Sequence, residues 1–252
     1  MSKAANGIEQ LEAYLTPKDR ERTRALWALA DLARVLAYLD QRAGRDRMLD
    51  MGCGFGGLSM AMGKRLGMNE VHGVDIDVDA LAEAEQKGVK ASRCEVGKDR
   101  LPYPDNSFDL LTSFGMLDYL PFFDDAMREI FRVIKPEGYV VVSLPNLASW
   151  YNRLALLLGY QPRDIEVSRE VVPGIHPYYR KRGSEPTGHI HAVTTGAFRE
   201  LAEHFGFTTT LVLGGCPSDP KTGGLLKSFD QLMARRPTLA KRFYYFGQKR
   251  LG

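Results

Sequence analysis

Four glycines stand close together just after a carboxylate in the segment MLDMGCGFGG, residues 48–57. Gly52, Gly54 and Gly57 have the spacing of a dinucleotide-binding fingerprint, whereas Gly52, Gly54 and Gly56 have the shorter spacing G-x-G-x-G. Glycines in a turn between a strand and a helix let backbone amides approach a ligand at van der Waals distance, where a Cβ atom would intrude. The sequence therefore predicts a ligand bound closely against this backbone.

Asp50, two residues before the first glycine, indicates the charge of that ligand. A carboxylate at the end of a strand would repel a dianionic pyrophosphate, because like charges raise each other's energy. The same carboxylate suits a ligand that carries positive charge. We therefore expect a cationic group, and not a phosphate bridge, at this turn.

Strands and helices alternate along the chain in the predicted secondary structure. Strands are expected at residues 47–51, 70–74, 89–96, 107–113 and 139–144, with helices at residues 18–43, 58–66, 78–87 and 123–134. This alternation predicts a parallel sheet covered by helices on both faces. Ligands of such sheets bind beyond the carboxyl ends of the strands, where the glycine turn is expected to lie.

Four segments follow one another in a characteristic order, namely LDMGCGFG, GVDID, LPYPDNSFDLLTS and IKPEGYVVVSLPN. In this order they resemble the motifs of the class I S-adenosylmethionine-dependent methyltransferases, in the small-molecule branch similar to methyltransferase domain 11. The resemblance covers most of the chain. It implies an α/β, Rossmann-like fold with a seven-stranded, mostly parallel sheet, an antiparallel last strand, helices on both faces, and helical and loop insertions that form a lid.

The resemblance also implies S-adenosylmethionine as the cofactor, S-adenosylhomocysteine as its product, and no metal. The implied cofactor-binding residues are Asp50, Gly52, Cys53, Gly54, Gly56, Asp75, Ile76, Glu95, Val96, Ser113, Phe114 and Gly115. Asp75, about 20 residues beyond the glycines, can accept hydrogen bonds from both ribose hydroxyls. Glu95 and the Val96 amide are expected to bind the adenine, with Asp99 as the alternative.

The catalytic group is less clearly marked, because the methyl group of this family's cofactor is already activated and positioning supplies most of the acceleration. After the fourth strand the common family pattern is an acid followed by a histidine, and this chain has Asp118 and Tyr119 there. A histidine base at that position of the chain is excluded, and Tyr119 is a weaker candidate. We expect His189 or His191 to orient the substrate or to act as base, unless both only tie down their loop.

The substrate site is expected between Pro145 and Thr195, where the chain is longer than the shortest family members. An amphipathic helix is predicted at residues 147–158, followed by a loop rich in proline and glycine. Candidates for contacts with an aromatic or anionic substrate are Tyr178, Tyr179 and Arg180. Trp150 is either an anchor in the core or a wall of the substrate site.

One domain is expected over residues 1–252. Its predicted parts are N-terminal helices at residues 1–45, a cofactor-binding core at 46–144, a substrate or lid insertion at 145–195, and a C-terminal completion of the sheet at 196–252. In this last part we expect helices at residues 195–204 and 225–235, a strand from residue 208, and an antiparallel strand at 241–250.

Composition limits the classes of protein to consider. No stretch has the roughly 18 consecutive apolar residues of a membrane span, and the N-terminus lacks the apolar core of a signal peptide, so a cytoplasmic protein is expected. Three widely spaced cysteines indicate neither a disulfide framework nor a zinc site. The net charge is +3, and cations dominate from Lys221 onward, as either a solvated surface or a site for an anionic partner.

Three functions remain open from the sequence. The leading one is transfer of a methyl group to an oxygen, nitrogen or carbon of a small molecule, either a metabolite or a lipid-like compound. The second is a partner or regulatory protein that binds the cofactor with weak or lost activity, and the third is a nicotinamide-dependent oxidoreductase. Nucleic acid is not the expected substrate, because residues 113–116 lack the motif of base-modifying enzymes. Monomer and homodimer both remain open.

Overall fold

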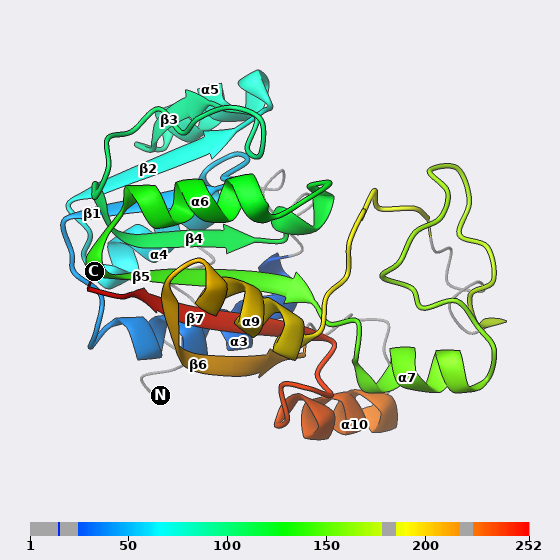
Figure 1. Cartoon of the computed structure of the whole chain (residues 1–252). Helices are drawn as coiled ribbons and strands as arrows, with labels where there is room; N and C mark the ends of the chain where they lie inside the picture. Colours follow the sequence, from blue (N-terminus) through cyan, green and yellow to red (C-terminus); the bar gives the residue numbers. More distant parts are fainter. Residues whose placement is uncertain (1–14, 16–24, 178–184, 217–223, 252) are drawn as a thin grey trace.

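The computed structural model describes residues 15, 25–177, 185–216 and 224–251 (Figure 1). Seven strands form one sheet, in the order β3-β2-β1-β4-β5-β7-β6. They are β1 (Arg47–Met51), β2 (Glu70–Asp75), β3 (Lys90–Arg93), β4 (Phe108–Phe114), β5 (Ile134–Pro145), β6 (Phe207–Gly215) and β7 (Arg242–Lys249). β7 lies between β5 and β6 and is antiparallel to both, whereas the other ladders are parallel. This confirms the predicted sheet and its reversed last strand.

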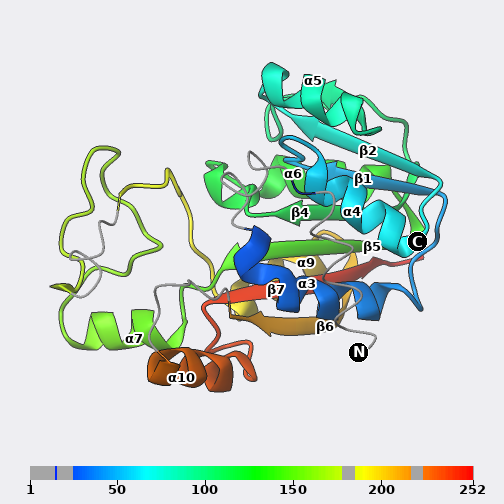
Figure 2. The ribbon, with the colours of Figure 1, turned by 180° about the vertical axis from the view of Figure 1, so that it is seen from behind.

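Helices cover both faces of the sheet (Figures 1 and 2). They are α3 (Ala25–Leu39), α4 (Gly57–Leu66), α5 (Val78–Gln86), α6 (Asp124–Val133) and α9 (Thr195–His204), with a short 3-10 helix, η1 (Leu117–Tyr119), after β4. Val141 packs in one buried cluster with side chains of α3 and α4, and its neighbours Val140 and Val142 pack in another with α6 and α9. Successive strand residues point to opposite faces, so this strand of consecutive valines is buried on both sides.

Several predicted boundaries differ from the structure by more than one residue. β5 begins at Ile134 and not at residue 139, because Ile134 already pairs with Phe108 before the register shifts. β3 is shorter than predicted and ends at Arg93. α3 ends at Leu39 and not at residue 43, and the predicted part of that helix at residues 18–24 lies outside the described residues.

The helix predicted at residues 147–158 starts later than expected. It is α7 (Trp150–Leu157). The Leu147 amide instead donates to the Val193 carbonyl, and the Ala148 amide donates to Oδ1 of Asn146. These two hydrogen bonds hold the start of the segment in a loop, as is typical for asparagine in turns.

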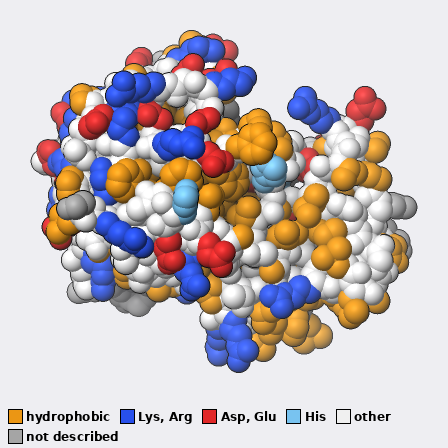
Figure 3. Space-filling model, viewed as in Figure 1, with side chains coloured by type: hydrophobic (Ala, Val, Ile, Leu, Met, Phe, Trp, Pro, Cys, Tyr) orange, Lys and Arg blue, Asp and Glu red, His pale blue; other side chains and the backbone are white. Residues whose placement is uncertain are grey.

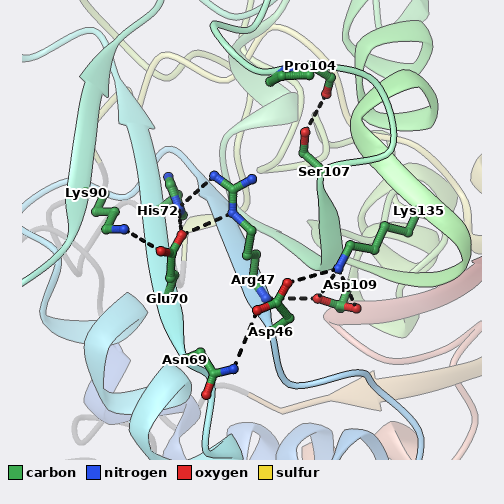
Figure 4. Close-up of polar contacts among 10 residues, drawn as sticks. All are labelled: Asp46, Arg47, Asn69, Glu70, His72, Lys90, Pro104, Ser107, Asp109 and Lys135. Atoms are coloured by element: carbon green, nitrogen blue, oxygen red, sulfur yellow. Dashed lines mark hydrogen bonds and ion pairs between the residues drawn. The ribbon is translucent and has the colours of Figure 1, made fainter.

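Polar side chains form a network of ion pairs and hydrogen bonds at the amino-terminal ends of the strands (Figure 4). Glu70 pairs with Arg47 at 3.1 Å and with Lys90 at 2.6 Å, and the hydrogen bonds from Lys90 and His72 lower the pKa of Glu70 to about 2. Asp109 accepts a hydrogen bond from the Arg47 amide at 2.8 Å. These contacts link neighbouring strands at the edge opposite the glycine turn.

The insertion after β5 lies beyond the carboxyl ends of β4 and β5 (Figures 1 and 2). Its helix α7 lies beside α10 (Gly224–Ala234). Trp150 Nε1 donates to Asp230 Oδ1 at 2.9 Å, and the rings of Trp150 and Phe229 meet edge to face with centroids 4.9 Å apart. Trp150 therefore anchors α7 to α10. The second predicted role of Trp150, as a wall of the substrate site, stays a prediction.

Within the described part of the chain, every helix is too short or too polar to pass through a lipid bilayer.

Candidate functional site

The glycine turn joins β1 to α4 and is held against the end of β2. The amides of Gly52 and Cys53 donate to the Val74 carbonyl at 2.8 and 3.1 Å, and the Gly54 amide donates to Asp75 Oδ2 at 2.8 Å. Gly52, Gly54 and Gly56 have φ angles of 80°, 51° and 74°. Only glycine adopts such a run of left-handed conformations without strain, so the backbone itself requires these residues.

Two of these glycines also make room for the protein's own packing. A Cβ atom on Gly52 would lie 2.9 Å from Met116 Cβ, and one on Gly56 would lie 2.7 Å from Ala84 Cβ and 2.9 Å from its Cα. α4 begins directly after Gly56, which offers no side chain to cap the helix. The glycine pattern thus has two causes, close internal packing and a helix N-terminus whose amides suit a ligand.

Asp50 lies beneath the turn and is 5% exposed. Its Oδ2 accepts a hydrogen bond from Ser59 Oγ at 2.6 Å, and its Oδ1 accepts one from Thr112 Oγ1 at 2.7 Å. Burial raises the pKa of Asp50 to about 6, against the lowering effect of these two hydrogen bonds. Both oxygens thus have partners inside the protein, and Asp50 supports the turn from below.

Asp75 and Ile76 end β2 beside the turn. Asp75 Oδ2 accepts the Gly54 amide at 2.8 Å, and its Oδ1 accepts the Asp77 amide at 3.1 Å. Each carboxylate oxygen can accept further hydrogen bonds, so this anchored group remains suited to a ribose diol. Ile76, one of the residues expected to bind the cofactor, is an apolar side chain that is 52% exposed.

The predicted adenine-binding turn follows β3. Glu95 Oε1 pairs with Lys98 at 2.5 Å, and Val96 is buried. Asp99 Oδ2 accepts the Glu95 amide at 2.8 Å. Asp99 therefore closes the turn, which favours Glu95 over Asp99 as the residue that faces the adenine.

The residues at the end of β4 contribute mainly backbone. Ser113 is fully buried, and its hydroxyl has no hydrogen-bond partner among the described residues. Gly115 has a φ of 69°, and its amide donates to the Ser143 carbonyl at 3.0 Å. Phe114 is partly exposed, whereas Cys53 is buried against Gly73 of β2. These placements fit the expected contribution of this segment through backbone and ring.

The structure brings a histidine to the end of β4 from a distant part of the chain. His189 Nε2 lies 3.1 Å from Asp118 Oδ2, and the Asp118 side chain is fully buried. Burial raises the pKa of Asp118, while the nearby charges of Arg242 and His189 lower it. The sequence excluded a histidine only at the position directly after Asp118, which is Tyr119. In the folded chain His189 lies beside Asp118 instead.

Two sets of hydrogen bonds hold the segment that carries His189. The amides of Ile190 and His191 donate to the Asp118 carbonyl at 2.8 and 3.1 Å. Upstream, Glu166 accepts the amides of Thr187 and Gly188, both at 2.7 Å, and the Thr187 hydroxyl at 2.6 Å. His189 is therefore fixed on both sides of its position in the chain.

The two candidate histidines diverge in the structure. His191 Nε2 contacts the Pro121 carbonyl, and its ring meets that of Phe123 at 5.9 Å. The Tyr119 ring, 43% exposed, meets the His189 ring edge to face at 5.1 Å. This arrangement gives His191 a structural contact and leaves His189 and Tyr119 together beside Asp118.

Arg242 belongs to the same site and was not predicted. It begins β7, and its Nη1 donates to the Ser143 carbonyl at 3.3 Å and to Ser143 Oγ at 3.1 Å. An arginine at the start of a strand is not part of a recognisable motif. Its place in the site therefore becomes apparent only from the antiparallel pairing of β7 in the structure. The predicted substrate contacts Tyr178, Tyr179 and Arg180 lie outside the described residues.

The residues present fit S-adenosylmethionine. The turn offers the N-terminus of α4 over a buried carboxylate, next to an anchored acid and an exposed apolar side chain at the end of β2. The amino-acid end of the cofactor, its ribose and its adenine match these three features in turn, because the carboxylate of the amino-acid end suits the helix N-terminus and its ammonium suits the charge of Asp50.

Comparisons with known proteins agree with this fold. The model of the methyltransferase domain family matches residues 49–142. The demethylmenaquinone methyltransferase of Bacillus licheniformis is 37% identical over 98 residues, which are 37% of this chain and 42% of that protein. The 24-methylenesterol C-methyltransferase 2 of Oryza sativa subsp. japonica is 37% identical over 114 residues, 43% of this chain and 31% of that protein. The matched segments thus span less than half the length of these curated relatives.

The fold has a near full-length counterpart among solved structures. The methyltransferase in a complex with the Haloferax volcanii Trm112 methyltransferase activator aligns with a TM-score of 0.65 over 96% of this chain and 98% of that chain, at 14% identity. A likeness at this identity concerns the fold alone. Together, these findings show a methyltransferase domain at residues 49–142 and a sheet that has the Rossmann-like fold of solved methyltransferases.

Proposed function

We propose that this chain transfers the methyl group of S-adenosylmethionine to a small molecule that binds beside Asp118 and His189. The observation that carries the proposal is the His189 Nε2 to Asp118 Oδ2 distance of 3.1 Å at the carboxyl end of β4. In open α/β sheets ligands bind at this end of the strands, and the glycine turn lies at the same edge. A histidine paired with a buried acid beside a cofactor site can accept a proton from a bound acceptor.

The chain's residues perform three tasks in this mechanism. The glycine turn, Asp75 and the turn at Glu95 hold the cofactor, which supplies an activated methyl group when bound. The walls beside Asp118 and His189 orient the acceptor so that its nucleophilic atom faces that methyl group, and such positioning can lower the barrier by several kcal/mol. The hydrogen on His189 Nε2 faces the Asp118 carboxylate. The other ring nitrogen, Nδ1, accepts the proton that the acceptor's O–H or N–H loses, and the Asp118 carboxylate stabilises the resulting imidazolium.

We further propose an acceptor with a substantial apolar part. Tyr119, Phe122 and Ile190, which adjoin the Asp118 and His189 pair in the chain, expose 43%, 74% and 42% of their surfaces. Two partial relatives are named as methyltransferases of demethylmenaquinone and of a 24-methylenesterol. In Figure 3 the surface is hollowed where the insertion meets the body of the sheet, with hydrophobic side chains at the hollow. These observations favour a lipid-like metabolite over a highly charged acceptor.

The two alternative functions have less support. A binding partner without transfer activity was suggested by the missing histidine after the fourth strand, and His189 removes that reason. A nicotinamide-dependent oxidoreductase would be expected to have an all-parallel order of six strands, whereas β7 here is antiparallel and lies between β5 and β6.

A labelled transfer assay tests the proposal. The protein would be incubated with S-adenosylmethionine labelled on the methyl group and with separate aqueous and lipid extracts of cells. We expect label in a product of the lipid extract, and far less with His189→Ala. Cofactor binding is measured separately by calorimetry with S-adenosylhomocysteine. Binding without labelled product in either extract would support the partner function, and binding of a nicotinamide cofactor instead would overturn the assignment.

A further inference from the structure

Two neighbouring helices carry large apolar side chains that face solvent. On α10, Leu225, Phe229 and Leu232 are 92%, 43% and 51% exposed and recur at the spacing of one helix stripe. The exposed leucines of α7 and the turn after it are Leu154, Leu156, Leu157 and Leu158. These seven residues, on two helices joined through Trp150, are called the α7–α10 surface below. Single exposed leucines are common in proteins, but seven large apolar side chains exposed on two adjoining helices mark an interaction site.

The charges of this surface are positive. Lys227, Arg235 and Arg236 are exposed on and just after α10, and Arg153 is exposed on α7. The acid of α10, Asp230, is 4% exposed, and it is paired with Lys241 at 2.5 Å. Figure 3 shows Lys and Arg side chains next to hydrophobic ones over α10 at the lower edge of the molecule. A helix with leucines, a phenylalanine and cations is typical of segments that lie in the interface of a membrane.

The positive charge of the α7–α10 surface favours an anionic membrane over a second copy of the chain as its binding partner. A second copy of the chain would bring its own cations against these, and like charges at close range destabilise a complex. An anionic lipid surface complements the same cations, and it accepts apolar side chains at the boundary between headgroups and acyl chains. We therefore propose that the α7–α10 surface docks on a membrane surface that contains anionic lipids.

The α7–α10 surface is connected to the catalytic pair of Asp118 and His189. The buried side of α7 carries Tyr151 and Asn152, which both bind the Asp164 carboxylate. Asp164 in turn lies close enough to Asp118 to act on its charge. The same insertion, residues 145–195, carries both α7 and His189 of the catalytic pair. The inference goes beyond the proposed function, because it concerns where the enzyme binds and not which reaction it performs.

Vesicle flotation tests the proposal without cofactor or acceptor. The full chain would be mixed with vesicles of phosphatidylcholine alone, or of phosphatidylcholine and phosphatidylglycerol in equal amounts. We expect binding to the anionic vesicles that weakens in high salt, as cation contacts with a charged surface do. The double variant Leu157→Glu with Leu225→Glu should lower this binding at least about tenfold, because glutamate adds repulsion and removes apolar contact.

Matched variants keep the test specific. Leu251→Glu changes a leucine that is 68% exposed outside the surface, and it should bind the vesicles like the unchanged protein. Arg235→Glu should lower the binding at least about fivefold, whereas Arg100→Glu, at an arginine 72% exposed elsewhere, should not. Thermal unfolding confirms that each variant is folded.

Three outcomes would overturn the proposal. These are no binding to the anionic vesicles, equal loss in surface and control variants, or equal binding to neutral vesicles. Light scattering on the same samples examines the other occupant, since a dimer that dissociates in the Leu157→Glu and Leu225→Glu variant would assign the surface to a second copy of the chain.

Discussion

His189 Nε2 lies 3.1 Å from Asp118 Oδ2, although the two residues come from separate segments of the chain. The Asp118 carbonyl accepts the amides of Ile190 and His191, so backbone contacts fix the same pair that the side chains form. The acid and the histidine that many family members carry next to each other in sequence are thus assembled here across the fold. Their activity can be tested one side chain at a time.

His189→Ala is expected to lower kcat about a hundredfold or more, because the acceptor's proton loses its base. Labelled methyl transfer to the acceptor found in the extract measures this rate, and S-adenosylhomocysteine affinity should stay within a few-fold. His191→Ala is the control, since its ring contacts Pro121 and Phe123 and not Asp118. Equal losses in both variants would mean that the histidines only hold their loop.

Asp75→Ala is expected to weaken S-adenosylhomocysteine binding by about tenfold to a hundredfold, because each lost hydrogen bond to a carboxylate contributes roughly 1.5–3 kcal/mol. Calorimetry measures the affinity. The neighbouring Asp77 caps α5 by accepting the Ala80 amide at 3.1 Å. Asp77→Ala should therefore lower stability by about 1 kcal/mol and leave the affinity nearly unchanged. Loss of affinity in Asp77→Ala alone would contradict the ribose assignment.

The pKa of Asp50, raised to about 6 by burial, predicts a pH-dependent stability. Between pH 4 and 6 the folded protein keeps a proton on Asp50 that the unfolded chain has lost, so the free energy of unfolding falls as pH rises. Between about pH 4.5 and 7 this group should account for about 2 kcal/mol of that fall. Urea unfolding at both pH values, compared with Asp50→Asn, isolates the effect. An equal fall in both proteins would place the titration elsewhere.

The charge of Asp50 also predicts how ligand affinity changes with pH. If a cationic amino-acid end lies above the turn, it stabilises the ionised carboxylate and lowers the pKa of Asp50 in the complex. Affinity for S-adenosylhomocysteine should then rise as pH increases through 6, and this rise should be absent in Asp50→Asn. Calorimetry across this pH range measures it, and a flat profile in the unchanged protein would argue against a positive group at that position.

Gly56→Ala is expected to lower the free energy of unfolding by about 2–4 kcal/mol, because its new Cβ would overlap Ala84 in addition to the strain of a left-handed conformation. Gly159 has a similar φ of 75° with no atom within 4 Å of the same position. Gly159→Ala therefore carries the strain alone, about 1–2 kcal/mol. Chemical unfolding compares the two variants, and equal losses would show that packing against α5 does not matter.

Lys241→Met is expected to destabilise the protein by about 3 kcal/mol, because it leaves Asp230 buried without its cation. Adding Asp230→Asn should restore most of this loss, since a neutral amide can still accept the Trp150 Nε1 hydrogen. Chemical unfolding of the single and double variants measures the coupling. Without restoration in the double variant, the loss would come from the Lys241 side chain's packing.

The sequence predicted most of the fold because its signals are local. The alternating strands and helices and the glycine turn follow from periodicity and spacing, whereas the reversed last strand was implied by the resemblance to the methyltransferase family. The α6 to β5 boundary was missed, because Glu137 adopts a φ of 62° within an irregular strand that reads as a turn. Pairing of Phe108 with Ile134 outweighs this local preference.

The candidate site was predictable only in part. The cofactor-binding residues follow one another in recognisable motifs, whereas the pair of His189 with Asp118 depends on the path of a long insertion. Arg242 enters the site because β7 runs antiparallel beside β5. The residues that flank His189 and Arg242 in the sequence form no pattern that predicts these contacts, so only the three-dimensional structure reveals them.

The position of β7 has a consequence for how the chain acquires its structure during synthesis. Among the described residues, β6 pairs only with β7, yet β7 follows it in sequence and also supplies the contact to β5. While the ribosome is still making the last strand, β6 and α9 lack their link to the rest of the sheet, and the edge of β5 stays open. Domains in this state expose strand edges that attract other chains. A chain that ends before Arg242 would keep the edge of β5 unpaired, and we expect it to aggregate.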